Sequence, residues 1–142
     1  MTPQTNIATF AAGCFWATEE TFRTTPGVIA TVVGHMAGDE VVQATYDPAQ
    51  ISYESLLIIF WDNHNPTVAN PGGLERAEIF AHDDEQMAAA LQSKASLAGS
   101  GKYRQPIVTP ISSASEFKRA PEDQQQYYLK HGIASCEMTN AK

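Results

Sequence analysis

Cys14 is the residue whose type and setting best suit chemistry. It lies within A-T-F-A-A-G-C-F-W, residues 8–16, directly after a glycine. Residues 7–12 have the pattern of a buried strand and residues 17–23 that of a helix, so Cys14 falls at a strand-to-helix junction. Amide groups at the start of a helix stabilise a thiolate, the reactive form of cysteine. Free cysteines also pack as small buried hydrophobes, so position alone leaves a reactive and an inert Cys14 open.

Phe15 and Trp16 follow Cys14 directly. Two large rings beside a sulfur atom can form an apolar pocket for a substrate, although ordinary core packing is the more common role of aromatic side chains. The neighbouring residues therefore add a hypothesis about substrate binding without deciding it.

Cys136 is the second of the two cysteines in the chain. Neither cysteine belongs to a C-x-x-C pair or lies at metal-ligand spacing from a histidine, so we expect no metal site. In a reducing compartment, a disulfide between them would be transient and redox-active rather than a static staple.

The composition limits the class of protein. A chain of 142 residues with 43% hydrophobic content suits one compact domain over residues 1–142. The formal net charge of -7 argues against a nucleic-acid partner or an anionic membrane surface. No apolar run is long enough to cross a bilayer, and the first residues lack the pattern of a secretion signal, so we expect a cytoplasmic protein.

Strands and helices are predicted to alternate in the first half of the chain. β-branched residues at 28–33 and 41–46 predict an antiparallel pair joined by a glycine-bounded connection. Ser52 is predicted to cap a helix whose apolar residues recur at helical spacing from Tyr53 to Phe60.

The second half is predicted to hold an irregular stretch, a strand, a helix capped by Asp83, a short strand and a final helix. Met87, Leu91 and Ala95 are predicted to form one face of the first of these helices. The other segments span residues 65–76, 77–80, 106–111 and 121–131 in that order. The class is therefore α+β, with a small ferredoxin-like mixed β-sheet packed with helices.

Six sequence blocks follow one another in a recognisable order. They are G-C-F-W at 13–16, T-T-P-G-V at 24–28, A-T-Y-D-P at 44–48, I-S-Y-E-S-L-L at 51–57, F-W-D-N-H-N-P at 60–66 and E-D-Q-Q-Q-Y-Y-L at 122–129. Together they resemble the peptide methionine sulfoxide reductases of the A type, over nearly the whole chain.

The resemblance implies roles for four residues. The cysteine of G-C-F-W, here Cys14, attacks the sulfoxide sulfur, takes the oxygen as a sulfenic acid and releases methionine. Phe15 and Trp16 match the rings that hold the S-methyl group, and the proton-donating glutamate falls on Glu40. A sulfoxide oxygen leaves only when protonated, so a carboxylic acid must face the thiolate. Without the resemblance, Glu40 reads as an ordinary surface charge.

The resemblance also implies a resolving role for Cys136. A sulfenic acid condenses readily with a nearby thiol, so a Cys14-Cys136 disulfide should form and a thioredoxin-type reductant should reopen it. No cofactor is expected. The alternative is that Cys136 is a frayed terminal residue without a partner.

The chain also departs from the family pattern. Members usually carry a glycine-rich arm with an active-site tyrosine where this chain has only residues 34–40, and a later block in which Glu75 and Asn70 replace a second tyrosine and an aspartate. Arg76 is retained. Shorter arms predict an opened pocket and a sulfoxide other than protein-bound methionine sulfoxide. Candidate replacements for the lost donors are Tyr103, Tyr127, Tyr128 and His35.

Two other classes of function stay open at this point. Loss of the donors favours a non-catalytic relative that keeps the fold for binding or redox sensing. The same two cysteines would also serve a thiol peroxidase or a disulfide sensor that has no sulfoxide substrate. Retention of Cys14, Glu40 and Cys136 together favours a sulfoxide reductase.

Overall fold

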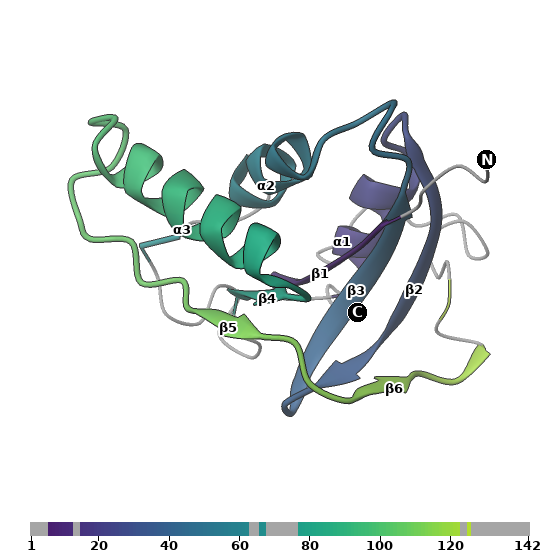
Figure 1. Cartoon of the computed structure of the whole chain (residues 1–142). Coiled ribbons are helices and arrows are strands. Elements are labelled where there is room, and N and C mark those ends of the chain that lie inside the picture. The colour runs from purple at the N-terminus through teal and green to yellow at the C-terminus, as the bar shows by residue number, and fades with distance from the viewer. Residues whose placement is uncertain (1–5, 13–14, 63–65, 68–76, 123–124, 126–142) are drawn as a thin grey trace.

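The computed structural model describes residues 6–12, 15–62, 66–67, 77–122 and 125. Strands and helices alternate along this part of the chain (Figure 1). The elements are β1 (Asn6–Ala12), α1 (Phe15–Arg23), β2 (Val28–Met36), β3 (Asp39–Tyr46), α2 (Tyr53–Asp62), β4 (Ala77–Ala81), α3 (Asp84–Ala98), β5 (Ile111–Ser113) and β6 (Phe117–Arg119).

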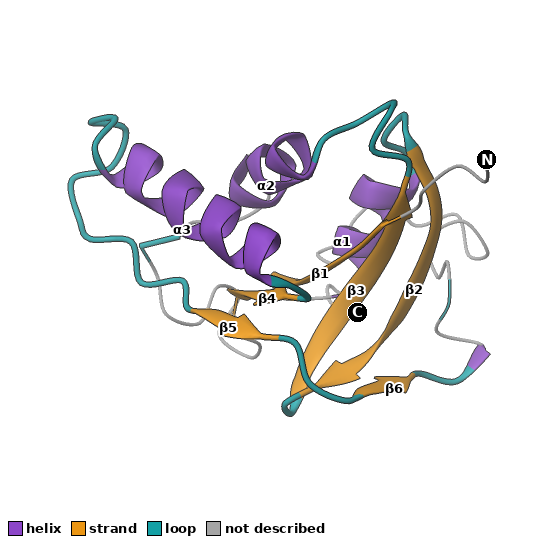
Figure 2. Ribbon diagram, viewed as in Figure 1, coloured by secondary structure: helices purple, strands orange, loops and turns teal. Residues whose placement is uncertain are grey.

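The strands form one sheet in the order β5-β4-β1-β3-β2-β6. All neighbours are antiparallel except β4 and β5, which are parallel. The inner four strands therefore have the order 4-1-3-2 with helices between β1 and β2 and between β3 and β4, which is the ferredoxin-like arrangement. Figure 2 shows the curled sheet with its helices, so the expected α+β class is confirmed.

Aromatic rings fill the centre of the main core. The ring of Phe10 lies 5.2 Å from that of Phe22, 6.2 Å from that of Tyr53 and 5.0 Å from that of Phe60, measured between centroids. These rings come from β1, α1 and α2, so the core holds both helices against the sheet. The α3 helix packs beside α2 and against β4 and β5.

The β2–β3 connection differs from the prediction. The segment expected as a loop is mostly strand, and only Ala37 and Gly38 form the turn. Both have positive φ, 53° and 86°, as a two-residue hairpin turn requires. Gly34 was predicted to end the strand but lies within it. A glycine is needed there because a Cβ would collide with the carbonyl oxygen of Lys118 and the ring of Phe117.

The helix caps were predicted correctly, but one helix face was not. The Ser52 hydroxyl accepts a hydrogen bond from the backbone N–H of Ser55, and the Asp83 carboxylate accepts one from the backbone N–H of Gln86. The predicted inner face of α3 is wrong, since Leu91 is 53% exposed whereas Gln86 and Ala90 are buried.

The last strands also depart from the sequence prediction. The strand expected at 106–111 is β5, which begins only at Ile111, and β6 was not predicted. The irregular stretch at 65–76 and the final helix at 121–131 lie almost wholly outside the described residues. Among the helices that are described, none is long and apolar enough to span a bilayer.

Candidate active site

Glu40 lies at the end of the sheet where β1 leads into Cys14. β1 and β3 run antiparallel, and their register pairs Phe10 with Val42. Because β1 finishes at Ala12 and β3 starts at Asp39, the two strands reach the same end of the sheet. The Glu40 backbone is therefore close to the point at which the chain leaves β1 for α1.

The Glu40 side chain lies on the helix-covered face of the sheet. Side chains alternate along a strand, so Glu40 shares a face with Val42, Ala44 and Tyr46, which are all buried. Val42 belongs to the same core cluster as Phe22 of α1. Glu40 itself is half-buried.

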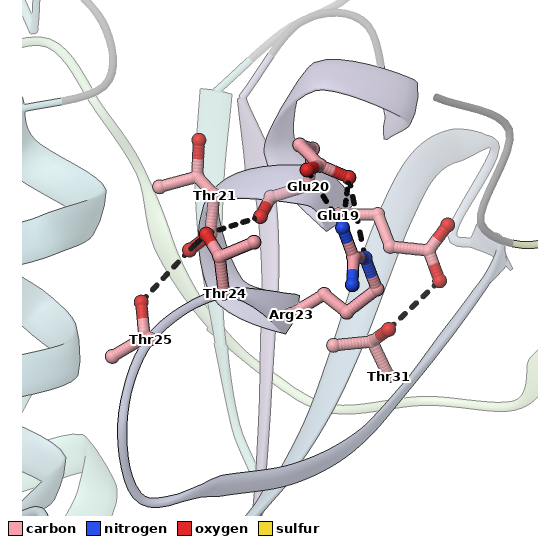
Figure 3. Close-up of polar contacts among 7 residues, drawn as sticks. All are labelled: Glu19, Glu20, Thr21, Arg23, Thr24, Thr25 and Thr31. Atoms are coloured by element: carbon pink, nitrogen blue, oxygen red, sulfur yellow. Dashed lines mark hydrogen bonds and ion pairs between the residues drawn. The ribbon is translucent and has the colours of Figure 1, made fainter. Parts of the chain in front are cut away.

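The α1 helix is fixed to β2 by a buried carboxylate. Glu19 is 1% exposed and accepts a hydrogen bond of 2.8 Å from the Thr31 hydroxyl (Figure 3). At the other end of the helix, Arg23 and Glu20 form an ion pair of 2.7 Å, and the Thr25 hydroxyl donates to a helix carbonyl. The Glu19–Thr31 bond therefore holds the helix, which begins at Phe15, against β2, whereas the other two contacts stabilise the helix itself.

A row of polar residues continues from Glu40 across the sheet. His35 lies directly opposite Glu40 on β2, and Lys118 lies opposite His35 on β6. Residues that are directly opposed in antiparallel strands project from the same face. Carboxyl, imidazole and ammonium groups therefore follow one another on neighbouring strands, and both His35 and Lys118 are exposed.

The comparisons with known proteins decide the family. The family model described as peptide methionine sulfoxide reductase matches residues 6–40 and 38–142. Over 96% of its length, the chain is 45% identical to the peptide methionine sulfoxide reductase MsrA of Methanoculleus marisnigri, of which 98% is covered. The chain belongs to the peptide methionine sulfoxide reductase family. The MsrA of Geobacter metallireducens is also 45% identical, over 95% of this chain and 97% of that protein.

Solved structures agree with this family. Mxr1 from Saccharomyces cerevisiae in reduced form superposes with a TM-score of 0.84 at 25% identity, covering 93% of this chain and 88% of that one. Methionine sulfoxide reductase A of Corynebacterium diphtheriae superposes with a TM-score of 0.77 at 26% identity, covering 95% and 79%. The fold of this chain is therefore the fold of the solved methionine sulfoxide reductase structures.

The family match breaks at the β2–β3 turn. Its two segments meet at residues 38–40, and the alignment with the Methanoculleus relative spans 160 positions against 142 residues here. The relative therefore carries residues that this chain lacks. In this member of the family, Ala37 and Gly38 close the hairpin directly beside Glu40.

Most of the residues assigned from the sequence lie outside the described part of the chain. This holds for Cys14 and Cys136, for the side chains of Phe15 and Trp16, and for Asn70, Glu75, Arg76, Tyr127 and Tyr128. Glu40, His35 and Tyr103 are the assigned residues that the structure describes in full. In the described residues, no group of His, Cys, Asp and Glu side chains has the arrangement of a metal site.

Two of the candidate replacements for the lost active-site hydrogen-bond donors lie in different parts of the structure. His35 lies across from Glu40, whereas Tyr103 belongs to the segment after α3, with the Lys102 ammonium 5.6 Å from its ring centroid. Figure 1 shows that segment far from β2 and β3. Sequence reasoning missed Lys118, because its position depends on β6 and a strand of only three residues leaves little periodic signal.

A cavity lies between α2 and α3, away from Glu40. Its volume is about 520 Å³, and its walls come from α2, α3 and the segment after α3, including Ile58, Trp61 and Leu97. No residue of β1, β2 or β3 lines it. This cavity is therefore separate from the end of the sheet where Glu40 lies, and we assign no reaction to it.

Proposed function

We propose that this chain is a thiol-dependent reductase of methionine S-sulfoxide or a related small sulfoxide, with Cys14 as nucleophile, Glu40 as acid and Cys136 as resolving thiol. The observation that carries the proposal is the position of Glu40. It lies at the sheet end where β1 leads to Cys14, on the face that α1 covers.

The first half of the reaction transfers one oxygen atom. The Cys14 thiolate attacks the sulfoxide sulfur while Glu40 protonates the departing oxygen, which lowers the cost of breaking the S=O bond. The oxygen ends on Cys14 as a sulfenic acid, and the substrate leaves as its sulfide. The start of α1 favours the thiolate through its backbone amides, and Phe15 and Trp16 would surround the S-methyl group.

The second half restores the thiol. Cys136 attacks the Cys14 sulfenic acid, which forms a disulfide and releases water, and an external dithiol then reduces that disulfide. The yeast relative has been solved in complex with Trx2, which supports a thioredoxin-type reductant here. A reducing compartment such as the cytoplasm suits cysteines that cycle in this way.

Glu40→Gln tests the acid with a close control. We expect kcat for a methionine S-sulfoxide substrate to fall by about 10²–10⁴-fold, the usual contribution of a general acid. Asp39→Asn changes the neighbouring carboxylate, which projects from the opposite face, and should leave kcat within about twofold. Equal losses in the two variants, or full activity in Glu40→Gln, would remove Glu40 from the mechanism.

The redox steps need a separate measurement. Reduced protein incubated with racemic sulfoxide should consume one enantiomer and yield a Cys14-Cys136 disulfide in peptide mass spectrometry. Cys14→Ser should abolish turnover. A thiol peroxidase or redox sensor would instead form the disulfide with peroxide, leave both sulfoxide enantiomers unchanged and tolerate Glu40→Gln.

A further inference from the structure

We propose that a pocket beside Glu40 binds the charged head of a free amino-acid sulfoxide, with Lys118 facing its carboxylate and Glu116 facing its ammonium group. The proposal rests on the reductase function and specifies the substrate class for that same site. It concerns substrate binding rather than the bond-breaking step.

The pocket is formed by the β2–β3 hairpin and the start of β6. Its volume is about 470 Å³, ample for one amino acid, and we call it the hairpin pocket. It is lined by His35, Ala37, Gly38, Ser115, Glu116 and Lys118. The turn offers only a methyl group and a hydrogen atom as side chains, so the cavity stays open on that side.

The hairpin pocket adjoins the proposed acid. His35 lines it and is the direct cross-strand neighbour of Glu40, while Lys118 is the neighbour of His35. Adjacent strands lie about 4.8 Å apart, so the backbones of Glu40 and Lys118 are roughly 10 Å apart on one face. A sulfoxide oxygen at Glu40 would leave the short aliphatic stem of the substrate running past His35 toward the pocket.

The charges of the hairpin pocket suit a zwitterion. Lys118 and Glu116 are both exposed, and within the part of the chain that the structure describes neither forms an ion pair. A pocket for a purely anionic group would not include Glu116, and one for a purely cationic group would not include Lys118. A free amino acid presents a carboxylate and an ammonium group on one carbon atom, and it pairs with both.

The location also explains why this chain should differ from its relatives. The family match breaks at residues 38–40, within the hairpin that forms one wall of the pocket. A methionine sulfoxide inside a peptide carries neutral amides at the two positions where a free amino acid carries charges. Charge-assisted hydrogen bonds are roughly twice as strong as neutral ones, so the free amino acid gains more in this pocket.

The test compares four substrates with the intact protein. They are L-methionine S-sulfoxide, its amide, its N-acetyl derivative and the N-acetyl amide, which keep both charges, the ammonium, the carboxylate and neither. With dithiothreitol as reductant, we expect kcat/KM to fall about tenfold for each charge removed, mostly through KM. Equal kcat/KM for all four would overturn the pocket proposal and leave the reductase function standing.

Two variants assign each charge to its residue. Lys118→Gln should reduce the preference for the acid over the amide to about twofold or less and keep the preference for the free amine. Glu116→Gln should do the reverse. Arg119→Gln changes the next residue of β6, which projects from the other face, and should keep both preferences. Loss of either preference in the Arg119 variant would contradict the assignment. Retention of both preferences in Lys118→Gln and in Glu116→Gln would contradict it as well.

A binding measurement tests the hairpin pocket even if the protein reduces no sulfoxide. NMR titration with free L-methionine sulfoxide should shift backbone signals of Glu116 and Lys118, and Lys118→Gln should weaken the apparent affinity. Binding without turnover would support the pocket and refute the reductase function. Absence of these shifts would refute the pocket whatever the activity.

Discussion

The two ends of strand β3 differ in their surroundings although they share one face. At the last residue, Tyr46 is 2% exposed and its ring lies 6.5 Å from that of Tyr53. At the start, Glu40 is half-buried, with exposed His35 on the neighbouring strand. One end is a packed aromatic core and the other an accessible row of ionisable groups, so substitutions at the two ends should separate stability from activity.

Phe10→Ala should have the largest effect on stability, because it removes the ring that lies against Phe22, Tyr53 and Phe60 in the main core. We expect a loss of about 3–5 kcal/mol in the free energy of unfolding, measured by urea denaturation. Ile58→Ala is the control, since Ile58 is 58% exposed and should change stability by less than about 0.5 kcal/mol. Similar losses in both variants would show that these stacked rings are not the main source of stability.

Gln125→Leu tests whether the polar end also holds a structural residue. The Gln125 amide is 1% exposed, accepts from the Val33 amide and donates to the carbonyls of Val33 and Ala120. Leucine would leave the buried Val33 N–H without its acceptor and cost about 1–3 kcal/mol. The same change at exposed Gln92 should leave the free energy of unfolding nearly unchanged. An unchanged free energy of unfolding in Gln125→Leu would refute a structural role for the Gln125 hydrogen bonds.

Tyr53→Phe should stabilise the aromatic end by about 1 kcal/mol, because the Tyr53 hydroxyl is buried and has no hydrogen-bond partner among the residues that the structure describes. Burial raises the pKa of this hydroxyl, so it stays protonated and its donor remains unused. Tyr46→Phe is the matched control of opposite sign, since the Tyr46 hydroxyl bonds to Asn6 and Gln86. Thermal unfolding of both variants measures the contrast, and destabilisation by Tyr53→Phe would contradict it.

Ala37→Asn should give the smallest effect, a gain of about 0.5–1 kcal/mol. Ala37 has φ 53°, a left-handed conformation that asparagine tolerates better than alanine, and Asn-Gly is the preferred pair in such turns. Gly38→Ala should destabilise instead, although its Cβ would meet open space, because φ is 86° there. A gain from Gly38→Ala would show that backbone strain does not govern this turn.

The sequence predicted the elements that carry strong local signals. The β-branched runs at 28–33 and 41–46 and the caps at Ser52 and Asp83 all lie where expected. The resemblance placed Glu40 on β3, and the sheet then explained how β3 brings it to the end of β1.

Long-range contacts account for the predictions that failed. Gln86 is buried because its amide donates to the Ile7 carbonyl and accepts from the His82 amide, and a hydrophobic pattern cannot identify a residue held inside by hydrogen bonds. Gly34 looked like the end of a strand, but its missing side chain makes room for the backbone of β6. The partnership of Glu40, His35 and Lys118 likewise depends on strand order, which local sequence does not encode.

The close approach at Gly34 has a consequence for self-association. The β6 strand covers the outer edge of β2 through only three paired residues, and the pair at Gly34 leaves no space for a methyl group. Gly34→Ala would push β6 away and uncover a row of unpaired backbone amides and carbonyls. An uncovered edge of this kind can pair with a strand from another molecule, so one added carbon should make the protein prone to edge-to-edge association.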